Sequence, residues 1–254
     1  MRKQRRPAHH RAHAVLHTDP VMRALITAAG PYALRSTAAE SPFRALIHSI
    51  AHQQLHATAA ARILERFIAL YAPEPFPSPS AVLATPAATL RAVGFSFAKI
   101  RALHDLAEKT LSGIVPPSMH LHELPDEVVV ERLTQVRGIG PWTVHMMLMF
   151  QLGRPDVLPV DDFGVRNGFR LAYGLKGMPT PRALAEFAER WRPYRTMASW
   201  YLWRAVELHR AERLPKAAQP PRVAIQKPPR KRTAKATSRL KSKKPLRRSP
   251  RAHK

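Results

Sequence analysis

The chain has 254 residues, of which 45% are hydrophobic and 23% are charged, so it can bury one substantial core or two smaller lobes. It contains no cysteine, which excludes disulfides, thiol nucleophiles, cysteine zinc sites and iron–sulfur clusters. No apolar run reaches the ~18 residues that a membrane span needs, and the basic start lacks the apolar stretch of a secretory signal. We therefore expect a protein that stays where it is made.

Positive charge dominates the sequence and is concentrated at its two ends. The formal net charge is +25, from 42 Lys and Arg against 17 Asp and Glu. Residues 1–18 hold 5 of these basic residues and residues 215–254 hold 15, and neither segment has an acid. The pattern predicts a basic N-terminal arm (1–18), a folded body (19–214) and a disordered Lys/Arg/Pro-rich tail (215–254). Such charge favours a polyanion such as nucleic acid, and the tail has no apolar face for a membrane.

The body is predicted to be all-helical, because Ala, Leu and Arg recur at spacings of three and four and strand-like alternation is absent. Ser41-Pro42 and Thr85-Pro86 each place a cap residue before a proline suited to a first helical turn. The expected helices are 42–50, 56–71, 79–84, 86–93, 97–112, 126–135, 141–152, 163–174, 181–191 and 195–211.

The most informative segment is 133–150, where one apolar helix stops at Gly138-Ile139-Gly140 and another begins at Pro141. Glycine tolerates a positive φ and lets another backbone approach closely, so a tight turn between two helices is expected. The free N–H groups and positive dipole end of the second helix suit a phosphate. This is the design of a helix-hairpin-helix that binds the DNA backbone without reading sequence. The alternative is an ordinary helix–turn–helix corner.

Paired acids, Asp161 and Asp162, follow the apolar run 157–160 and precede a predicted helix. Acids before helices commonly cap them, so capping is the simpler interpretation of this pair taken alone. The hairpin upstream changes its meaning, because Asp162 lies 20 residues beyond Trp142.

Together, the hairpin and the paired acids resemble the helix-hairpin-helix (HhH-GPD) superfamily of DNA glycosylases, and most closely its alkylation-repair branch, the DNA-3-methyladenine glycosylase II group. Further segments are similar to that group: the Gln-containing helix boundary at 48–60, the Gly-x-Ser-x-x-Lys segment at 93–101 and the last helix at 191–203. The resemblance covers roughly residues 20–211. It implies an all-α, two-lobed fold, without the N-terminal β-rich domain of larger relatives.

The resemblance implies an enzyme that flips an alkylated, 3-methyladenine-type base out of duplex DNA and hydrolyses its N-glycosidic bond, which starts base excision repair. Asp162 is the implied catalytic carboxylate, stabilising a cation-like sugar, and Asp161 is its rival for that role. Branches that also nick the strand carry a lysine nucleophile where this chain has Trp142, so a monofunctional enzyme is expected.

The resemblance also implies the surroundings of the flipped base. Trp142, Met146 and Trp203 match the base pocket, although plain core packing is the alternative for each tryptophan. Met146 stands where the best-known relatives carry an aromatic residue. Gln54, with Leu55 second, is expected to be the wedge that fills the gap in the duplex; the alternative is that Leu55 is a core residue and the glutamines Gln53 and Gln54 cap helix ends.

The hairpin is expected to bind a DNA phosphate through Gly138, Ile139, Gly140 and Thr143. No cofactor is expected to be required, but the resemblance implies a structural Na⁺ or K⁺ at the hairpin. Its ligands would be the backbone carbonyls of Thr134, Val136 and Ile139.

The expected partner is therefore double-stranded DNA with damaged bases, bound by a monomer that has no membrane role and lies in the cytoplasm at the nucleoid. Two rival functions stay open. One is a helix-hairpin-helix DNA-binding protein without catalysis, for which basic ends suffice. The other is a glycosylase with a different preference, for oxidised or deaminated bases.

Overall fold

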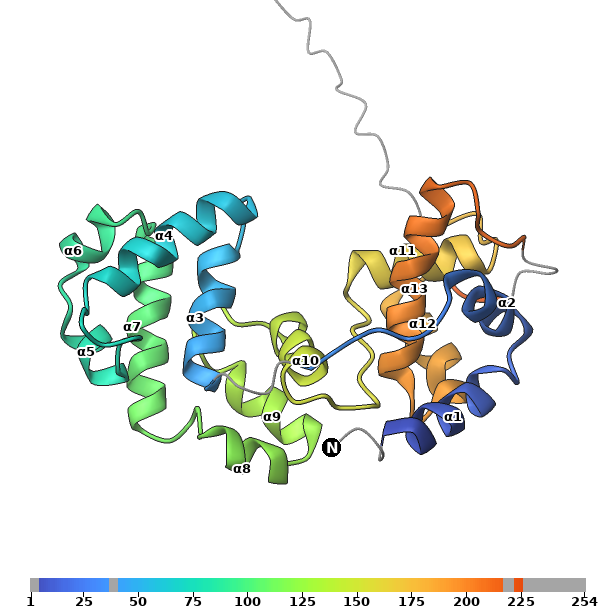
Figure 1. Ribbon diagram of the computed structural model, residues 1–254, viewed down its shortest axis with the longest axis horizontal. Coiled ribbons are helices and arrows are strands. Elements are labelled where there is room, and N and C mark those ends of the chain that lie inside the picture. Colours follow the sequence, from blue (N-terminus) through green and yellow to red (C-terminus); the bar gives the residue numbers. More distant parts are fainter. Residues whose placement is uncertain (1–4, 37–40, 217–221, 226–254) are drawn as a thin grey trace, which may run out of the picture.

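The computed structural model describes residues 5–36, 41–216 and 222–225 (Figure 1). Over these ranges the chain is helical, with one isolated β-bridge between Pro179 and Ile225, so the all-α prediction is confirmed. No helix in them is long and apolar enough to cross a membrane. The helices are α1 (Arg5–Leu16), α2 (Pro20–Ala29), α3 (Pro42–His52), α4 (Ala57–Ala69), α5 (Pro79–Ala84), α6 (Ala87–Ala92), α7 (Phe97–Leu111), α8 (Ser118–Glu123), α9 (Asp126–Leu133), α10 (Pro141–Phe150), α11 (Phe163–Ala172), α12 (Pro181–Ala188), the 3₁₀ turn η1 (Glu189–Trp191) and α13 (Arg195–Arg210).

Two hydrophobic cores divide the helices into two lobes, as predicted. Helices α3 to α10 enclose one core, and α1, α2 and α11 to α13 enclose the other, so the first and last parts of the chain share a lobe (Figure 1). The chain returns to this lobe between α10 and α11, where Val157 belongs to the first core and its neighbour Leu158 to the second. This crossing places the paired acids at the junction of the lobes.

Side-chain caps explain several helix starts. The Ser41 hydroxyl accepts a hydrogen bond from the Arg44 N–H at 3.3 Å, as the Ser-Pro signal predicted. The corresponding prediction for Thr85 is wrong. Pro86 occupies the N-cap of α6, and the Thr85 hydroxyl instead donates to the Ala81 carbonyl at 2.8 Å, within the preceding turn.

The N-terminal segment departs from the predicted arm. Residues 5–16 form α1, whose Ala12 and Leu16 are 2% and 0% exposed in the core of the second lobe. Asp19 then caps α2 by accepting the N–H groups of Val21 and Met22. The prediction of an arm outside the folded body is therefore wrong over α1, because two apolar residues one turn apart give a basic segment a face to bury.

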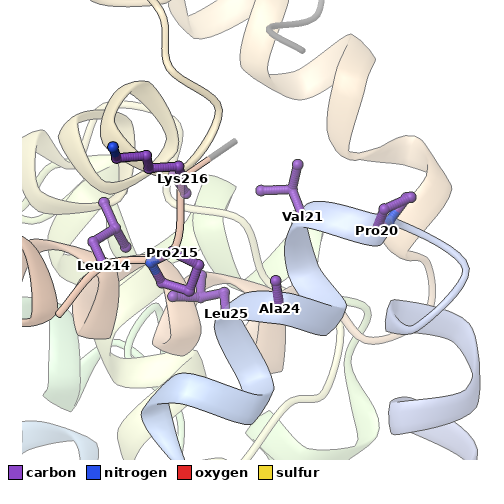
Figure 2. Close-up of a pocket in the computed structure, with 8 residues that line it drawn as sticks. Pro20, Val21, Ala24, Leu25, Leu214, Pro215 and Lys216 are labelled. Atoms are coloured by element: carbon purple, nitrogen blue, oxygen red, sulfur yellow. The ribbon is translucent and has the colours of Figure 1, made fainter. Parts of the chain in front are cut away.

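Most of the predicted tail, residues 217–221 and 226–254, lies outside the described residues. Its first described part, Pro215 and Lys216, lies against α2 and borders a small apolar pocket of about 150 Å³ together with Pro20 and Val21 (Figure 2). Residues 222–225 are placed by the bond from the Thr180 N–H to the Ala224 carbonyl, at 2.9 Å. The described parts of the tail are thus docked on the second lobe.

Helices α11 and α13 pack closely enough that a side chain at their crossing has no room. A Cβ on Gly168 would lie 1.9 Å from the backbone oxygen of Leu202. Because that neighbour is backbone, it cannot rotate away, and the two helices would have to separate.

Gly168→Ala is therefore expected to lower the free energy of unfolding by about 2 kcal/mol or more, since the added methyl overpacks a rigid contact. Gly140→Ala is the matched control, because its Cβ would meet nothing within 4 Å and its φ is −103°. Urea unfolding of both variants measures the difference. Equal midpoints for the two would contradict this packing.

A buried polar cluster joins α2 to the end of the second lobe. The Asp19 Oδ2 accepts the Tyr173 hydroxyl at 2.5 Å and the Trp191 indole N–H at 3.3 Å. Burial, and then the neighbouring Asp19 charge, raise the pKa of Tyr173 well above its ordinary value. The protonated phenol is thus part of the native structure.

This cluster predicts a loss of stability in alkali. In the unfolded chain Tyr173 ionises near pH ~10, whereas the fold keeps it protonated, so the free energy of unfolding should fall as the pH rises above that value. Urea unfolding at several pH values between 8 and 11 measures this fall in the free energy of unfolding, which should be ~1 kcal/mol. Tyr173→Phe should be less stable at neutral pH and fall less steeply. An unchanged slope would assign the effect to Tyr32 and Tyr201, whose pKa values burial raises to about 12.

Candidate active site

The hairpin joins α9 to α10 through residues 134–140. Val136 and Ile139 are 1% and 4% exposed and anchor the turn in the first core. Gly138 adopts a φ of +78°, which explains the glycine, and Gly140 is the extended N-cap before Pro141. Gly138 is exposed, so the outer part of the turn offers backbone rather than side chains. Such a surface suits a phosphate partner.

An acid on α7 holds this turn from behind. The Asp105 Oδ2 accepts the Arg137 N–H at 2.6 Å, and the Lys109 ammonium donates to both oxygens at 2.7 and 2.8 Å. Burial alone raises the pKa of Asp105, but these two donors more than offset it and hold that pKa below its ordinary value. Asp105 was not predicted as a site residue, because no sequence motif links α7 to the hairpin.

The structure brings Asp162 together with two of the predicted pocket residues. Asp162 is the N-cap of α11, and its Oδ1 accepts the Val165 N–H at 2.7 Å. The same oxygen accepts the Trp203 indole N–H at 2.8 Å, and Oδ2 accepts the Trp142 indole N–H at 2.8 Å. The two interpretations of Asp162, as a helix cap and as a site residue, are therefore compatible.

Asp161 has a different environment. It is exposed, whereas Asp162 is half-buried. Its charge acts on His145 of α10, where burial lowers the pKa of the imidazole and Asp161 partly opposes that effect. The geometry thus favours Asp162 as the carboxylate of the site, because aromatic donors surround Asp162 and not its neighbour.

A cavity of about 660 Å³ opens between α3 and α10; Asp162 does not line it, but Trp142, which donates to Asp162, does. Trp142, Thr143 and Met146 of α10 line one side, and the end of α3 lines the other. Trp142 is 48% exposed, so it is not a plain core residue. The residues that line the cavity are Ala45, His48, Ser49, His52, Gln53, Gln54, Gly138, Trp142, Thr143, Met146 and Gln151.

Trp203 does not line this cavity; it is linked through Asp162 to Trp142, which does. It is partly buried and packs against both cores, and Phe150 of α10 stacks on it with ring centres 5.9 Å apart and an angle of 19°. Phe150 was not identified from the sequence. Its place at the end of α10, two turns beyond Trp142, is the signal that could have revealed it.

The loop between α3 and α4 carries the predicted wedge residues at an exposed tip. Gln54 has a φ of +57°, uncommon for a residue with a side chain, and Leu55 is 42% exposed. Leu55 is therefore not a core residue, whereas the capping alternative holds for Gln53, which occupies the C-cap of α3.

Two hydrogen bonds with other elements hold this loop, and neither pair of partners was predicted from the sequence. The Gln53 amide donates to the Gly138 carbonyl of the hairpin at 2.9 Å. The Lys99 ammonium donates to the Ala51 carbonyl at the end of α3 at 2.7 Å, and burial lowers its pKa. Lys99 belongs to the Gly-x-Ser-x-x-Lys segment, so its motif was visible but its partner was not.

The predicted cation ligands lie in and beside the hairpin turn. Thr134 is the C-cap of α9, and the Val136 carbonyl accepts the Ile139 N–H at 3.0 Å, which leaves it a second lone pair. Among the described residues, no group of three His, Asp or Glu side chains is placed to hold a metal ion. Any cation at this turn would therefore depend on neutral backbone oxygens, a donor type that hard cations accept.

Residues 47–193 match the model of the HhH-GPD superfamily of base excision DNA repair proteins. The chain is 41% identical over 174 residues to DNA-3-methyladenine glycosylase 1 of Schizosaccharomyces pombe, a match that covers 68% of this chain and 76% of that protein. The solved structure of the 3-methyladenine DNA glycosylase Mag1 of the same yeast in complex with abasic DNA is 39% identical, with a TM-score of 0.69, covering 78% of this chain and 97% of that one. A DNA-3-methyladenine glycosidase from Bacillus halodurans is 32% identical, with a TM-score of 0.72 and coverages of 79% and 90%.

These matches include both lobes, the hairpin and the segment that carries Asp162. They agree with the resemblance that the hairpin and the paired acids indicated. The chain belongs to the HhH-GPD superfamily of base excision DNA repair proteins.

Proposed function

We propose that this protein is a monofunctional DNA glycosylase that flips alkylated, 3-methyladenine-type bases out of duplex DNA and hydrolyses their N-glycosidic bonds. The observation that carries the proposal is the Asp162 carboxylate, held on a helix-hairpin-helix scaffold by three N–H donors, one of which, Trp142, lines a cavity. The relatives that the chain matches are named for 3-methyladenine, which supports this class of substrate.

Asp162 supplies the charge that the reaction needs. As the glycosidic bond lengthens, positive charge develops on the sugar, and a fixed carboxylate beside it stabilises the transition state electrostatically. A lysine nucleophile is replaced by Trp142 in this chain, so water attacks the sugar and the product is an abasic site.

The cavity between α3 and α10 receives the flipped base. Alkylated purines often carry positive charge, and the exposed face of Trp142 attracts such a ring, by ~0.5–2 kcal/mol depending on desolvation. Met146 forms a softer, more adaptable wall than an aromatic residue. This combination supports a pocket for alkylated bases rather than for one fixed base shape.

DNA is held on either side of this pocket. The backbone of Gly138, Ile139 and Gly140, with Thr143 in the first turn of α10, binds a phosphate, since the N–H groups of a first helical turn have no intrahelical partner. Gln54 and Leu55, exposed at the tip of their loop, fill the space that the base vacates.

A monovalent cation, Na⁺ or K⁺, is proposed at the hairpin, with the carbonyls of Thr134, Val136 and Ile139 as its ligands. It would add positive charge beside the bound phosphate. The enzyme is proposed to act as a monomer in the cytoplasm, at the nucleoid, where its substrate lies.

Asp162→Asn is expected to lower the rate of excision at saturating enzyme by about 100-fold or more, because it removes the charge and keeps the shape. The assay uses duplexes with one methylated adenine, methylated guanine, hypoxanthine or etheno-adenine, followed by alkali to reveal abasic sites. Binding to abasic DNA should be retained. Asp161→Asn is the matched control and should excise at nearly the wild-type rate.

The reverse result, an inactive Asp161→Asn and an active Asp162→Asn, would exchange the two roles. A wild-type protein that binds duplex DNA but excises none of these bases would support the rival function, a DNA-binding protein without catalysis. Faster excision of hypoxanthine than of methylated bases would favour the other rival, a preference for deaminated bases.

Gln53→Ala is expected to weaken base flipping by about tenfold, since it removes the hydrogen bond that fixes the wedge loop on the hairpin. The fluorescence of 2-aminopurine placed beside the lesion reports the flipped state. Gln135→Ala is the control, because the amide of this exposed glutamine bonds back to the preceding helix α9, at the Glu131 carbonyl. Equal flipping by the two variants would show that the loop does not need the hairpin.

A further inference from the structure

Trp142 and Trp203 present their indole N–H groups, and not only their ring faces, to the site. Each N–H donates to a different oxygen of the same carboxylate at 2.8 Å. They come from α10 and α13, at 20 residues before and 41 residues after Asp162 in the sequence. The carboxylate thus accepts one indole hydrogen bond on each of its oxygens, from two different helices.

We propose that Trp142 and Trp203 are positioning residues that fix the Asp162 carboxylate for the reaction through their indole N–H groups. This role rests on the proposed glycosylase function. For Trp142 this is a second task besides lining the cavity, and a phenylalanine at either position could not perform it because its ring has no N–H donor.

The hydrogen bonds leave Asp162 one orientation. Oδ1 accepts two N–H groups, from Val165 and Trp203, and Oδ2 accepts one, from Trp142. A carboxylate has about four acceptor sites, so these bonds leave about one, on Oδ2. The sugar and the attacking water therefore meet Oδ2, and any rotation of the carboxylate breaks at least one bond.

Gly164, two residues after Asp162, leaves room for the Trp203 indole to reach the carboxylate. A Cβ on Gly164 would lie 2.8 Å from Cδ1 and 3.0 Å from Nε1 of Trp203, and 3.1 Å from Oδ1 of Asp162. A side chain there would push the indole off the carboxylate. Phe150 stacks on the same indole, so the position of Trp203 depends on this ring contact and on the missing side chain at Gly164.

Trp142 connects the Asp162 carboxylate to the cavity proposed for the base. Its N–H edge is used by Asp162, while the ring is 48% exposed and lines the cavity. A base that stacks on this ring therefore rests on the same side chain that orients the carboxylate. The placement of the base and the orientation of the Asp162 carboxylate thus both depend on Trp142.

The test separates the N–H group from the ring. Trp142 is replaced by 3-benzothienylalanine, in which sulfur takes the place of the N–H, and by phenylalanine. Single-turnover excision at saturating enzyme should slow by about tenfold to a hundredfold in both, because a hydrogen bond to a charged group is lost. Affinity for abasic DNA should stay within about twofold, since the ring face is kept.

Gly164→Ala tests the second indole without removing an aromatic ring, and should slow excision in the same way. Trp200→Phe is the matched control and should excise at the wild-type rate, because Trp200 packs on Tyr32 and Tyr201, away from Asp162. Thermal unfolding of each variant confirms that it is folded.

A spectroscopic readout does not depend on activity. In ¹⁵N spectra the indole N–H resonances of Trp142 and Trp203 should move in Asp162→Asn, while those of Trp191 and Trp200 stay. Two results would overturn the positioning role. One is that the indole resonances of Trp142 and Trp203 do not move in Asp162→Asn although the wild-type protein excises the base. The other is that the benzothienylalanine variant excises at the wild-type rate. Loss of DNA affinity in step with excision would overturn it too. A wild-type protein that excises nothing, with resonances that do move, would overturn the proposed function and leave the contact as structural only.

Discussion

The arrangement of the site depends on one carboxylate placed where the two lobes meet. A half-buried charge is costly unless hydrogen bonds replace its water, and Asp162 obtains them from three separate helices. One donor is on α10, which belongs to the first core, and another is Trp203, which packs against both. The bonding of Asp162 is therefore complete only when the lobes are docked, and the folded junction and the formed site are one structure.

The position of Asp162 also depends on contacts inside the second lobe that do not touch the carboxylate. The second lobe combines α1 and α2 with the last helices, and Asp19 ties its two halves together through Tyr173 and Trp191. Gly168 lets α11 and α13 approach closely, which sets the position of α11 and so of its N-cap, Asp162. A destabilising change in this lobe should thus weaken catalysis by displacing the charge, even where it touches neither base nor DNA.

The sequence was sufficient for features that have a local cause. Gly138, Gly140 and Pro141 specify a turn and a helix start, and the structure has both there. It was insufficient where burial came from elsewhere: α1 is rich in Arg and His, and it buries Ala12 and Leu16 in a surface supplied by later helices. The tryptophans could be assigned to the pocket, but their N–H bonds to Asp162 join residues 20 and 41 positions apart, and no spacing rule predicts such partners.

The wedge loop follows the same physical logic as the carboxylate. A left-handed conformation at Gln54 costs about 1–3 kcal/mol and persists only where its surroundings enforce it. Here the bonds from Lys99 to the Ala51 carbonyl and from Gln53 to the Gly138 carbonyl supply that constraint where α3 enters the loop, just before the tip. A loop already ordered in this way loses little entropy when it enters the duplex. Because one of its anchors is the hairpin itself, a phosphate bound there and a wedge inserted beside the lesion reinforce each other.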